Sequence, residues 1–168
     1  ILRGMTITEI SSLANPKVKD AVRLRQRSHR DAARLMLVEG YREIRRALDH
    51  AYRPSALFYC EALWLKHANE PALVEACAAR GARLYACTRP VFEKLAYRER
   101  PDGLLAVGPQ VARPLAGLEL PEDALVLVCE AIEKPGNLGT MLRSADASGA
   151  AAVAGRVHDD GVIGLAPS

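Results

Sequence analysis

The sequence of 168 residues has few aromatic side chains, no long apolar run and no signal-peptide pattern at its start. Aromatic residues make up 5% of a chain that is 49% hydrophobic and 26% charged, which is a globular composition. A membrane-spanning helix needs about 18 consecutive apolar residues, and no such run occurs. We therefore expect a cytoplasmic protein with no membrane partner.

The sequence also lacks the spacing of common metal and phosphate sites. Cys60, Cys77, Cys87 and Cys129 are too irregularly spaced for a zinc motif, and the histidines form no local ligand cluster. Free cysteine prefers the protein interior, so buried thiols and no metal site are expected. Neither a GxGxxG fingerprint nor a GK[ST] phosphate loop is present, which disfavours a dinucleotide-binding or P-loop enzyme.

Positive charge is concentrated in one segment. Between Lys17 and Arg46 the chain has ten basic and four acidic residues, a local net charge of +6, so the remainder carries −3. Such a segment suits a nucleic-acid backbone, although a solvated helix face has the same composition. The candidate nucleic-acid-binding residues are Asn15, Lys17, Lys19, Arg23, Arg25, Arg27, Arg30, Arg42 and Arg46.

Periodicity predicts one α/β domain over residues 6–108. Asn15 and Pro16 have the pattern of a helix start, followed by Val18, Ala21, Val22 and the stem of Arg25 on one face. A later helix is expected to turn Ile44, Ala47, Leu48 and Ala51 inward. Alternating strands and helices favour a mostly parallel sheet. The expected strands are 35–38, 56–60, 83–87 and 104–107, and the other expected helices are 71–79 and 90–96.

A second unit follows a linker. Residues 109–123 contain three prolines and no clear period, which predicts a linker before a partial domain at 124–168. The apolar run 124–132 predicts a strand buried on both faces, followed by a turn-rich loop at 133–139. We expect a helix from about Leu138 to Ser148, closed by Gly149, and then a strand at 150–154.

The loop between this strand and helix is the candidate for chemistry. A helix N-terminus at the carboxyl end of a strand can meet an anion, and glycines allow close approach of its backbone. Asn137 can cap the helix, and Arg143 can reach back over the loop. An ordinary strand-to-helix turn with a surface arginine gives the same pattern.

The segment 133–149, EKPGNLGTMLRSADASG, resembles the first motif of the SpoU/TrmH RNA methyltransferases. The N-terminal half resembles the ribosomal-protein-like RNA-binding domain that precedes the trefoil-knot SPOUT domain in many members. The segments that carry this second resemblance are 10–19 (ISSLANPKVK), 37–40 (LVEG) and 101–107 (PDGLLAV).

The resemblance implies methyl transfer from S-adenosylmethionine to a ribose 2′-hydroxyl, most often of ribosomal RNA, by a homodimer. Arg143 matches the motif arginine, which favours the alkoxide electrostatically, and Asn137 matches the asparagine that shapes the loop. Glu133 either orients Arg143 or is simply solvated. Four aromatic residues, Phe58, Tyr59, Trp64 and Tyr85, lie in apolar runs and are expected in the core, so recognition would depend on charge and RNA shape.

The resemblance ends near Ala154. Residues 155–168 do not match the later motifs that form the S-adenosylmethionine pocket, so we expect a truncated or frameshifted chain without a methyl-donor site. Two alternatives remain: an RNA-binding module without catalysis, and a nucleotide-binding α/β enzyme unrelated to RNA.

Overall fold

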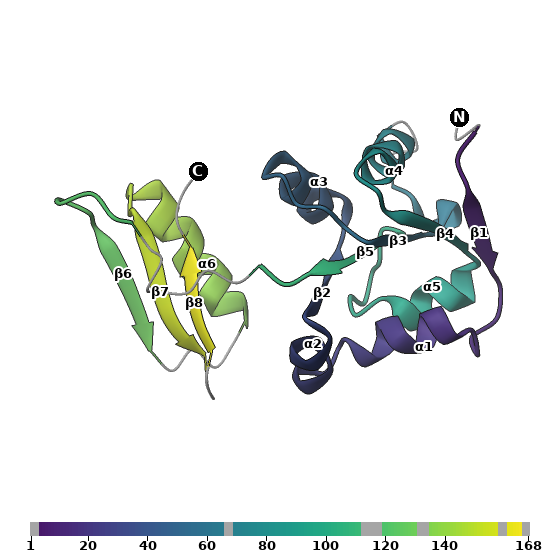
Figure 1. Cartoon of the computed structure of the whole chain (residues 1–168), viewed down its shortest axis with the longest axis horizontal. Helices are drawn as coiled ribbons and strands as arrows, with labels where there is room; N and C mark the ends of the chain where they lie inside the picture. The colour runs from purple at the N-terminus through teal and green to yellow at the C-terminus, as the bar shows by residue number, and fades with distance from the viewer. Residues whose placement is uncertain (1–3, 66–68, 112–118, 131–134, 158–160, 166–168) are drawn as a thin grey trace. The chain divides into compact units, whose positions relative to one another are not determined.

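The computed structural model describes residues 4–65, 69–111, 119–130, 135–157 and 161–165. The chain divides into two compact units, Ile1–Gln110 and Val111–Ser168, and each is described here by itself. Both units combine strands with helices (Figure 1), which confirms the expected α/β class. None of the helices in these described ranges is long and apolar enough to cross a bilayer.

The first unit has a five-stranded sheet made of β1 (Ile7–Ile10), β2 (Leu35–Glu39), β3 (Ala56–Tyr59), β4 (Arg83–Cys87) and β5 (Leu104–Pro109). The strand order is β1-β4-β3-β5-β2, which leaves β1 and β2 at the edges. β1 and β3 run parallel to β4, whereas β5 is antiparallel to β3 and to β2. β2 therefore points the same way as β1, β3 and β4, so four of the five strands run in one direction, in line with the prediction of a mostly parallel sheet. β5 is the exception, because strand direction depends on long-range pairing that local periodicity does not record.

Helices cover both faces of this sheet. α1 (Pro16–Arg23) and α5 (Arg89–Leu95) share one hydrophobic cluster with the strands, and α3 (Tyr41–Asp49) and α4 (Glu70–Ala79) share the other. Figure 1 shows α1 and α5 together on one side of the strands and α3 and α4 on the other. The first unit therefore buries both faces of its own sheet.

The start of α1 follows the sequence prediction, and its end does not. The Asn15 side chain accepts a hydrogen bond of 2.9 Å from the Lys17 backbone N–H, and Pro16 occupies the first helical turn. The sequence predicted that the stem of Arg25 continues the buried face of the helix. Leu24, which is only 6% exposed, is buried there instead. Arg25 lies beyond the helix and is exposed.

Sequence periodicity also missed short elements that bury little. The helix α2 (Arg27–Ala33) has no buried residue, so it lacks the apolar stripe that would have revealed it. The strand β1 has only Ile10 fully buried. The inward placement of Ala51 was wrong, because α3 ends at Asp49 and Ala51 is exposed with a φ of 60°.

The thiols and the aromatic residues of the apolar runs are buried, as expected. All four cysteines are free, and burial raises the pKa of Cys77 to about 11 and that of Cys87 to about 12. The thiols of Cys77 and Cys87 are therefore protonated and unreactive at neutral pH.

The predicted core aromatics also contact one another. Phe58 stacks on Tyr85 with ring centroids 4.8 Å apart. The four predicted core aromatics, each less than 10% exposed, are Phe58, Tyr59, Trp64 and Tyr85.

The second unit contains a smaller sheet in the order β6-β7-β8. Its strands are β6 (Val126–Glu130), β7 (Ala152–Val157) and β8 (Gly161–Leu165), and its helix is α6 (Pro135–Ala147). β6 runs parallel to β7, as a strand–helix–strand crossover requires, and β8 is antiparallel to β7.

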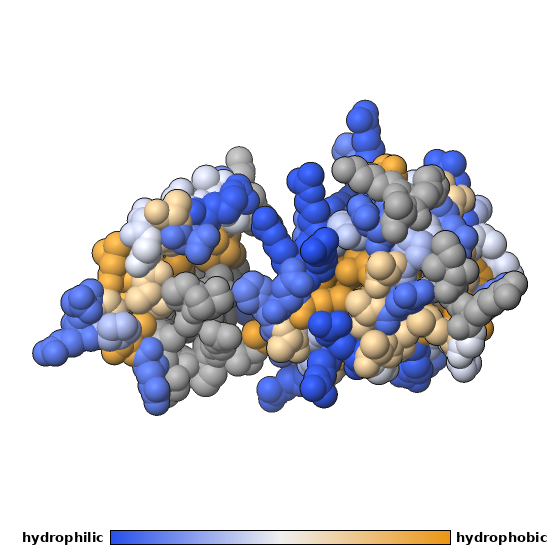
Figure 2. Space-filling model, turned by 90° about the horizontal axis from the view of Figure 1, so that it is seen from above, coloured by the Kyte–Doolittle hydropathy of each residue, from blue (hydrophilic) through white to orange (hydrophobic). Residues whose placement is uncertain are grey.

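The strand β6 is less buried than the sequence predicted. Val128 is 74% exposed and Leu125, just before the strand, is 57% exposed, whereas Cys129 faces the cluster under α6. Figure 2 shows hydrophobic residues on the outer surface of this unit. The expectation of a strand buried on both faces was wrong, because β6 is an edge strand and α6 packs on one side of it.

The helix α6 begins earlier than predicted and ends as predicted. Its first residue is Pro135, so Asn137 is the third residue of the helix and the prediction that it caps the helix was wrong. Proline suits this first position because its fixed φ is already helical. At the other end the Gly149 and Ala150 N–H groups donate to Asp146 and Ala145 carbonyls, and Gly149 has a φ of 69°. This is the Schellman arrangement that glycine favours.

Candidate functional site

The second unit presents its candidate site at the start of α6. The side chain of Asn137 is exposed in the first turn of the helix. The partial positive charge of the helix N-terminus adds to any cation nearby, so this end of α6 can attract an anion. Glu133 was also predicted here, and it lies outside the described residues.

Arg143 is exposed and extends back toward that helix start. Its Nη2 donates a hydrogen bond of 3.1 Å to Thr140 Oγ1, one turn earlier. Its Nη1 lies 3.5 Å from the position that a Cβ would take at Gly139. The guanidinium therefore lies along the first turns of α6, where its charge adds to the helix dipole. Chemically, this pair can stabilise an oxyanion or a phosphate.

The basic candidates of the first unit lie on two sides of its sheet. Lys17, Lys19 and Arg23 are exposed on α1, whereas Arg42 and Arg46 are exposed on α3, which packs on the opposite face. The edge strand β2 leads from α2 to α3, so it joins the two groups (Figure 1). The structure thus does not gather the predicted residues into one compact patch.

Several of these residues also have intramolecular roles. Arg23 forms an ion pair of 3.6 Å with Asp20, and Arg27 forms one of 3.3 Å with Asp31. Both pairs are exposed, and such pairs contribute at most about 1 kcal/mol. The Asn15 side chain accepts the hydrogen bond that caps α1. A nucleic acid could replace the ion pairs at little cost, but not the cap.

Arg25 and Arg30 donate hydrogen bonds to backbone carbonyl oxygens. Arg25 Nη2 donates 2.7 Å to the Lys94 carbonyl and also bonds the Ala96 carbonyl, at the end of α5. Arg30 Nη1 donates 3.0 Å to the Leu24 carbonyl and 2.8 Å to that of Arg25, which satisfies the end of α1. These two arginines therefore fix the junction of α1, α2 and α5. Carbonyls are neutral, so both positive charges remain.

A buried carboxylate lies where β2 meets α3. Glu39 is 0% exposed; its Oε2 accepts 2.9 Å from the Tyr97 N–H, and the Glu39 N–H donates 3.3 Å to the Tyr97 hydroxyl. Burial raises the pKa of Glu39, opposed by the backbone N–H groups of Tyr97 and Arg98 and by the Arg98 charge. Reciprocal hydrogen bonds of this kind fix the Tyr97 loop onto β2.

The same loop also caps α3. Asp102 Oδ2 accepts 2.7 Å from the Tyr41 N–H in the first turn, and Arg98 forms a 2.8 Å ion pair with Glu43. Gly40, with a φ of 110°, leaves room for the Arg98 side chain that a Cβ would obstruct. Residues 97–102 and 39–43 thus form one polar junction at the β2 edge of the sheet.

Tyr97 is a surface residue that the sequence prediction missed. It is 53% exposed, in contrast to the four buried aromatics. The sequence feature that could have identified it is its position just after a helix and close to Arg98 and Arg100. Aromatic residues interleaved with arginines in a loop are typical of nucleic-acid contacts.

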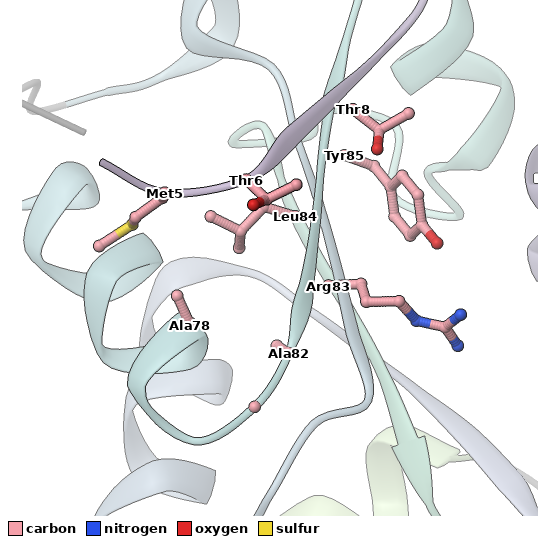
Figure 3. A pocket seen from close by; sticks show the side chains of 9 residues that line it. Met5, Thr6, Thr8, Ala78, Ala82, Arg83, Leu84 and Tyr85 are labelled. Atoms are coloured by element: carbon pink, nitrogen blue, oxygen red, sulfur yellow. The ribbon is translucent and has the colours of Figure 1, made fainter. Parts of the chain in front are cut away.

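The hollow at the opposite edge of the sheet is less suited to chemistry. It lies beside β1 and β4, with a volume of about 460 Å³. Figure 3 shows Thr8, Arg83 and Tyr85 on one side of the strands, with Met5 and Ala78 on the other. Its polar groups therefore do not converge on one point, as a binding site requires.

Comparison with known proteins identifies the first unit. Residues 15–106 match the model of the MRM3-like substrate binding domain, which is more than half of the chain. The match spans the basic helices α1 to α3, the Glu39 junction and Tyr97.

Relatives and solved structures extend the likeness into the second unit. RlmP, the 23S rRNA (guanosine(2553)-2′-O)-methyltransferase of Bacillus subtilis, is 31% identical over 86% of this chain and 53% of its own length. The crystal structure of an RNA 2′-O ribose methyltransferase is 40% identical with a TM-score of 0.72, over 91% of this chain and 57% of that one. The AdoMet-bound rRNA methyltransferase of Sinorhizobium meliloti is 29% identical with a TM-score of 0.75, over 88% and 53%.

The first unit thus has the fold of an MRM3-like substrate binding domain, and the similarity to RNA methyltransferases continues into the second unit. The chain belongs to the SpoU/TrmH family of RNA 2′-O-methyltransferases and carries their MRM3-like substrate binding domain. It spans about half the length of the relatives and structures that it matches.

Proposed function

We propose that this chain serves S-adenosylmethionine-dependent 2′-O-ribose methylation of RNA, with ribosomal RNA as the substrate. The observation that carries the proposal is the succession, in one chain, of the matched substrate-binding domain and a strand–loop–helix unit bearing Arg143. Both substrates of this reaction are found in the cytoplasm, and that location is part of the proposal.

The first unit holds the RNA in this proposal. Five exposed residues, Lys17, Lys19, Arg23, Arg42 and Arg46, supply charge on both sides of the β2 edge. Only Arg23 of these forms an ion pair recorded among the described residues, and that pair is exposed. Binding through such charges weakens as salt rises, since each neutralised phosphate releases counterions. Arg25, Arg27 and Arg30 add charge nearby, and Asn15 fixes the start of α1.

Arg143 stabilises the reacting oxygen in this proposal. A ribose hydroxyl is a weak nucleophile, and it becomes a stronger one as its proton passes to a solvent base and negative charge develops on its oxygen. The guanidinium and the positive end of α6 lie together, and both favour that charge. Asn137 shapes the helix start, and Glu133 orients the arginine.

The described residues do not define a methyl-donor site. Among the described residues, buried polar side-chain atoms without a hydrogen-bond partner occur in Glu39, Trp64 and Asp102 of the first unit. We assign no donor-binding residue, and no step of the mechanism depends on one. In the S. meliloti relative, bound AdoMet is present.

Methyl transfer itself tests the proposal. Labelled S-adenosylmethionine and ribosomal RNA are incubated with the chain, and the RNA is then hydrolysed with alkali. A 2′-O-methyl group blocks hydrolysis at its nucleotide, so label should appear in alkali-resistant dinucleotides. RNA binding without label transfer would instead favour the alternative function, an RNA-binding module without catalysis.

A homodimer is included in the proposal. Leu125, Val128 and Met141 are exposed apolar residues of the second unit, and a second copy could cover them. Light scattering of the purified chain at several concentrations would show the mass of a dimer if this is correct, and that of one chain if it is not.

A further inference from the structure

A shallow hollow of about 310 Å³ lies beside the Glu39 junction. Its lining residues are Leu24, Arg25, Arg30, Met36, Leu37 and Tyr97. Three of these residues are apolar, one is a tyrosine and two are arginines. No acidic residue is among them, so the hollow is apolar and positively charged.

We propose that this hollow holds one unpaired base of the RNA, stacked on the ring of Tyr97. The inference rests on the proposed function, since it specifies how the substrate-binding unit contacts RNA. A base offers an aromatic face and is joined to a phosphate. An aromatic ring beside fixed cations therefore matches both parts of a nucleotide.

Tyr97 is exposed and yet rigidly held. Glu39 bonds both its backbone N–H and its hydroxyl, and Arg25 bonds the carbonyl of the preceding residue, Ala96. The first and third of these bonds fix the backbone around Tyr97, and the ring cannot turn away without breaking the 3.3 Å bond to its hydroxyl, although the residue is 53% exposed. A ring that is fixed before binding loses little conformational entropy when a base stacks on it.

The two arginines that line the hollow are also held by hydrogen bonds and keep further donors for a ligand. Among the described residues, the hydrogen bonds of Arg25 use only Nη2 and those of Arg30 use only Nη1, while a guanidinium has five N–H donors. Neither forms an ion pair with a described carboxylate. Their remaining donors can bond a phosphate or a base edge without breaking an ion pair.

The size of the hollow limits its occupant. A volume of about 310 Å³ is at the small end of ligand pockets, so it suits a single nucleotide and not a longer stretch. Paired bases keep their faces within the helix stack. The hollow therefore selects a bulged or loop nucleotide over a continuous duplex.

The test compares two hairpin RNAs that differ by one bulged 2-aminopurine in the stem. The unmodified chain should bind the bulged hairpin roughly five- to tenfold more tightly, and stacking should quench the fluorescence of the base. Tyr97→Leu should remove both the preference and the quenching. Tyr97→Phe keeps the stacking face but loses the hydrogen bond to the hydroxyl, so it should retain the quenching and a reduced preference. Circular dichroism melting checks that each variant folds.

The outcomes separate this inference from the proposed function. Equal affinity for the two hairpins, or a preference that survives Tyr97→Leu, would overturn the stacking site and leave RNA binding intact. Failure to bind either hairpin would overturn both the stacking site and the RNA-binding role of the first unit.

Discussion

The two units differ in how completely they cover their own sheets. In the first, two hydrophobic clusters occupy opposite faces, and each includes fully buried residues such as Leu57 and Phe92. In the second, one small cluster lies between α6 and the strands, and Val128 is 74% exposed on the other side. The first unit therefore has the core of a self-sufficient domain, whereas the second leaves apolar surface open.

This difference matches the two kinds of proposed site. The proposed binding residues of the first unit are fixed by interior contacts, such as Tyr97 held by the buried Glu39. Among the described residues, the candidate group of the second unit, Arg143, forms one side-chain hydrogen bond, and it is exposed. The proposed binding surface of the first unit is thus held in place by contacts with its domain core, whereas the proposed reaction site of the second unit is held by fewer contacts.

The largest contrast in stability is expected between alanine substitutions in the two sheets. Leu57→Ala creates a cavity in the first unit and should lower the free energy of unfolding by about 2–5 kcal/mol. Val128→Ala removes an exposed side chain and should change it by less than about 0.5 kcal/mol. Urea unfolding followed by Trp64 fluorescence reports the first change, because Trp64 lies in the same cluster as Leu57. Circular dichroism reports the second.

The comparison would fail if Val128→Ala were as damaging as Leu57→Ala. That result would mean that the outer face of β6 is covered in solution.

Arg143→Ala should separate catalysis from binding. Removing one group that stabilises an oxyanion typically lowers turnover by roughly 10²–10³-fold, and RNA affinity should be unchanged because the first unit supplies it. Methyl transfer and RNA binding are measured on the same preparation. Thr140→Val is the matched control, since it removes the hydroxyl that accepts a hydrogen bond from Arg143 but keeps the guanidinium, and it should have a smaller effect. Full turnover in Arg143→Ala would show that the guanidinium has no role in the reaction.

Two glycines with positive φ offer a smaller comparison. Gly149 has open space around its missing Cβ, so Gly149→Ala should cost only the left-handed backbone, about 1–2 kcal/mol. Gly40→Ala should cost more, because the new Cβ also meets the Arg98 and Glu43 side chains and disturbs their 2.8 Å ion pair. Thermal unfolding of both variants measures the difference. Equal losses of stability in the two variants would show that the Arg98 and Glu43 side chains can move aside without lowering the free energy of unfolding.

Local patterns predicted most helices of the first unit but not the geometry of its site. The start of α1 and the Gly149 end of α6 follow from residue chemistry that acts within a few positions. The roles of Arg25 and Tyr97 depend on partners 69 and 58 residues away. A charge count records Arg25 only as a cation, because it cannot show which carbonyls the fold brings beside it. The antiparallel placement of β5 was missed for the same reason.

The smallest effects should distinguish arginines that only bind RNA from those that also hold the fold. Arg42 is exposed on α3 and has no ion pair or hydrogen bond with a described residue, so Arg42→Gln should leave stability within about 0.5 kcal/mol. It should weaken RNA binding and reduce the log–log salt slope by about 0.7–0.9.

Arg25→Gln should instead lower both RNA affinity and the free energy of unfolding, the latter by about 1–2 kcal/mol, since the carbonyls at the end of α5 lose a charged donor. Arg53→Gln makes the same charge change at an exposed residue outside the candidate set and serves as the control. Salt titrations of RNA binding and urea unfolding of all three variants give the two quantities separately. If Arg42→Gln and Arg53→Gln have equal effects on binding, the α3 side of the first unit does not contact RNA, and the binding surface is confined to the side that carries α1.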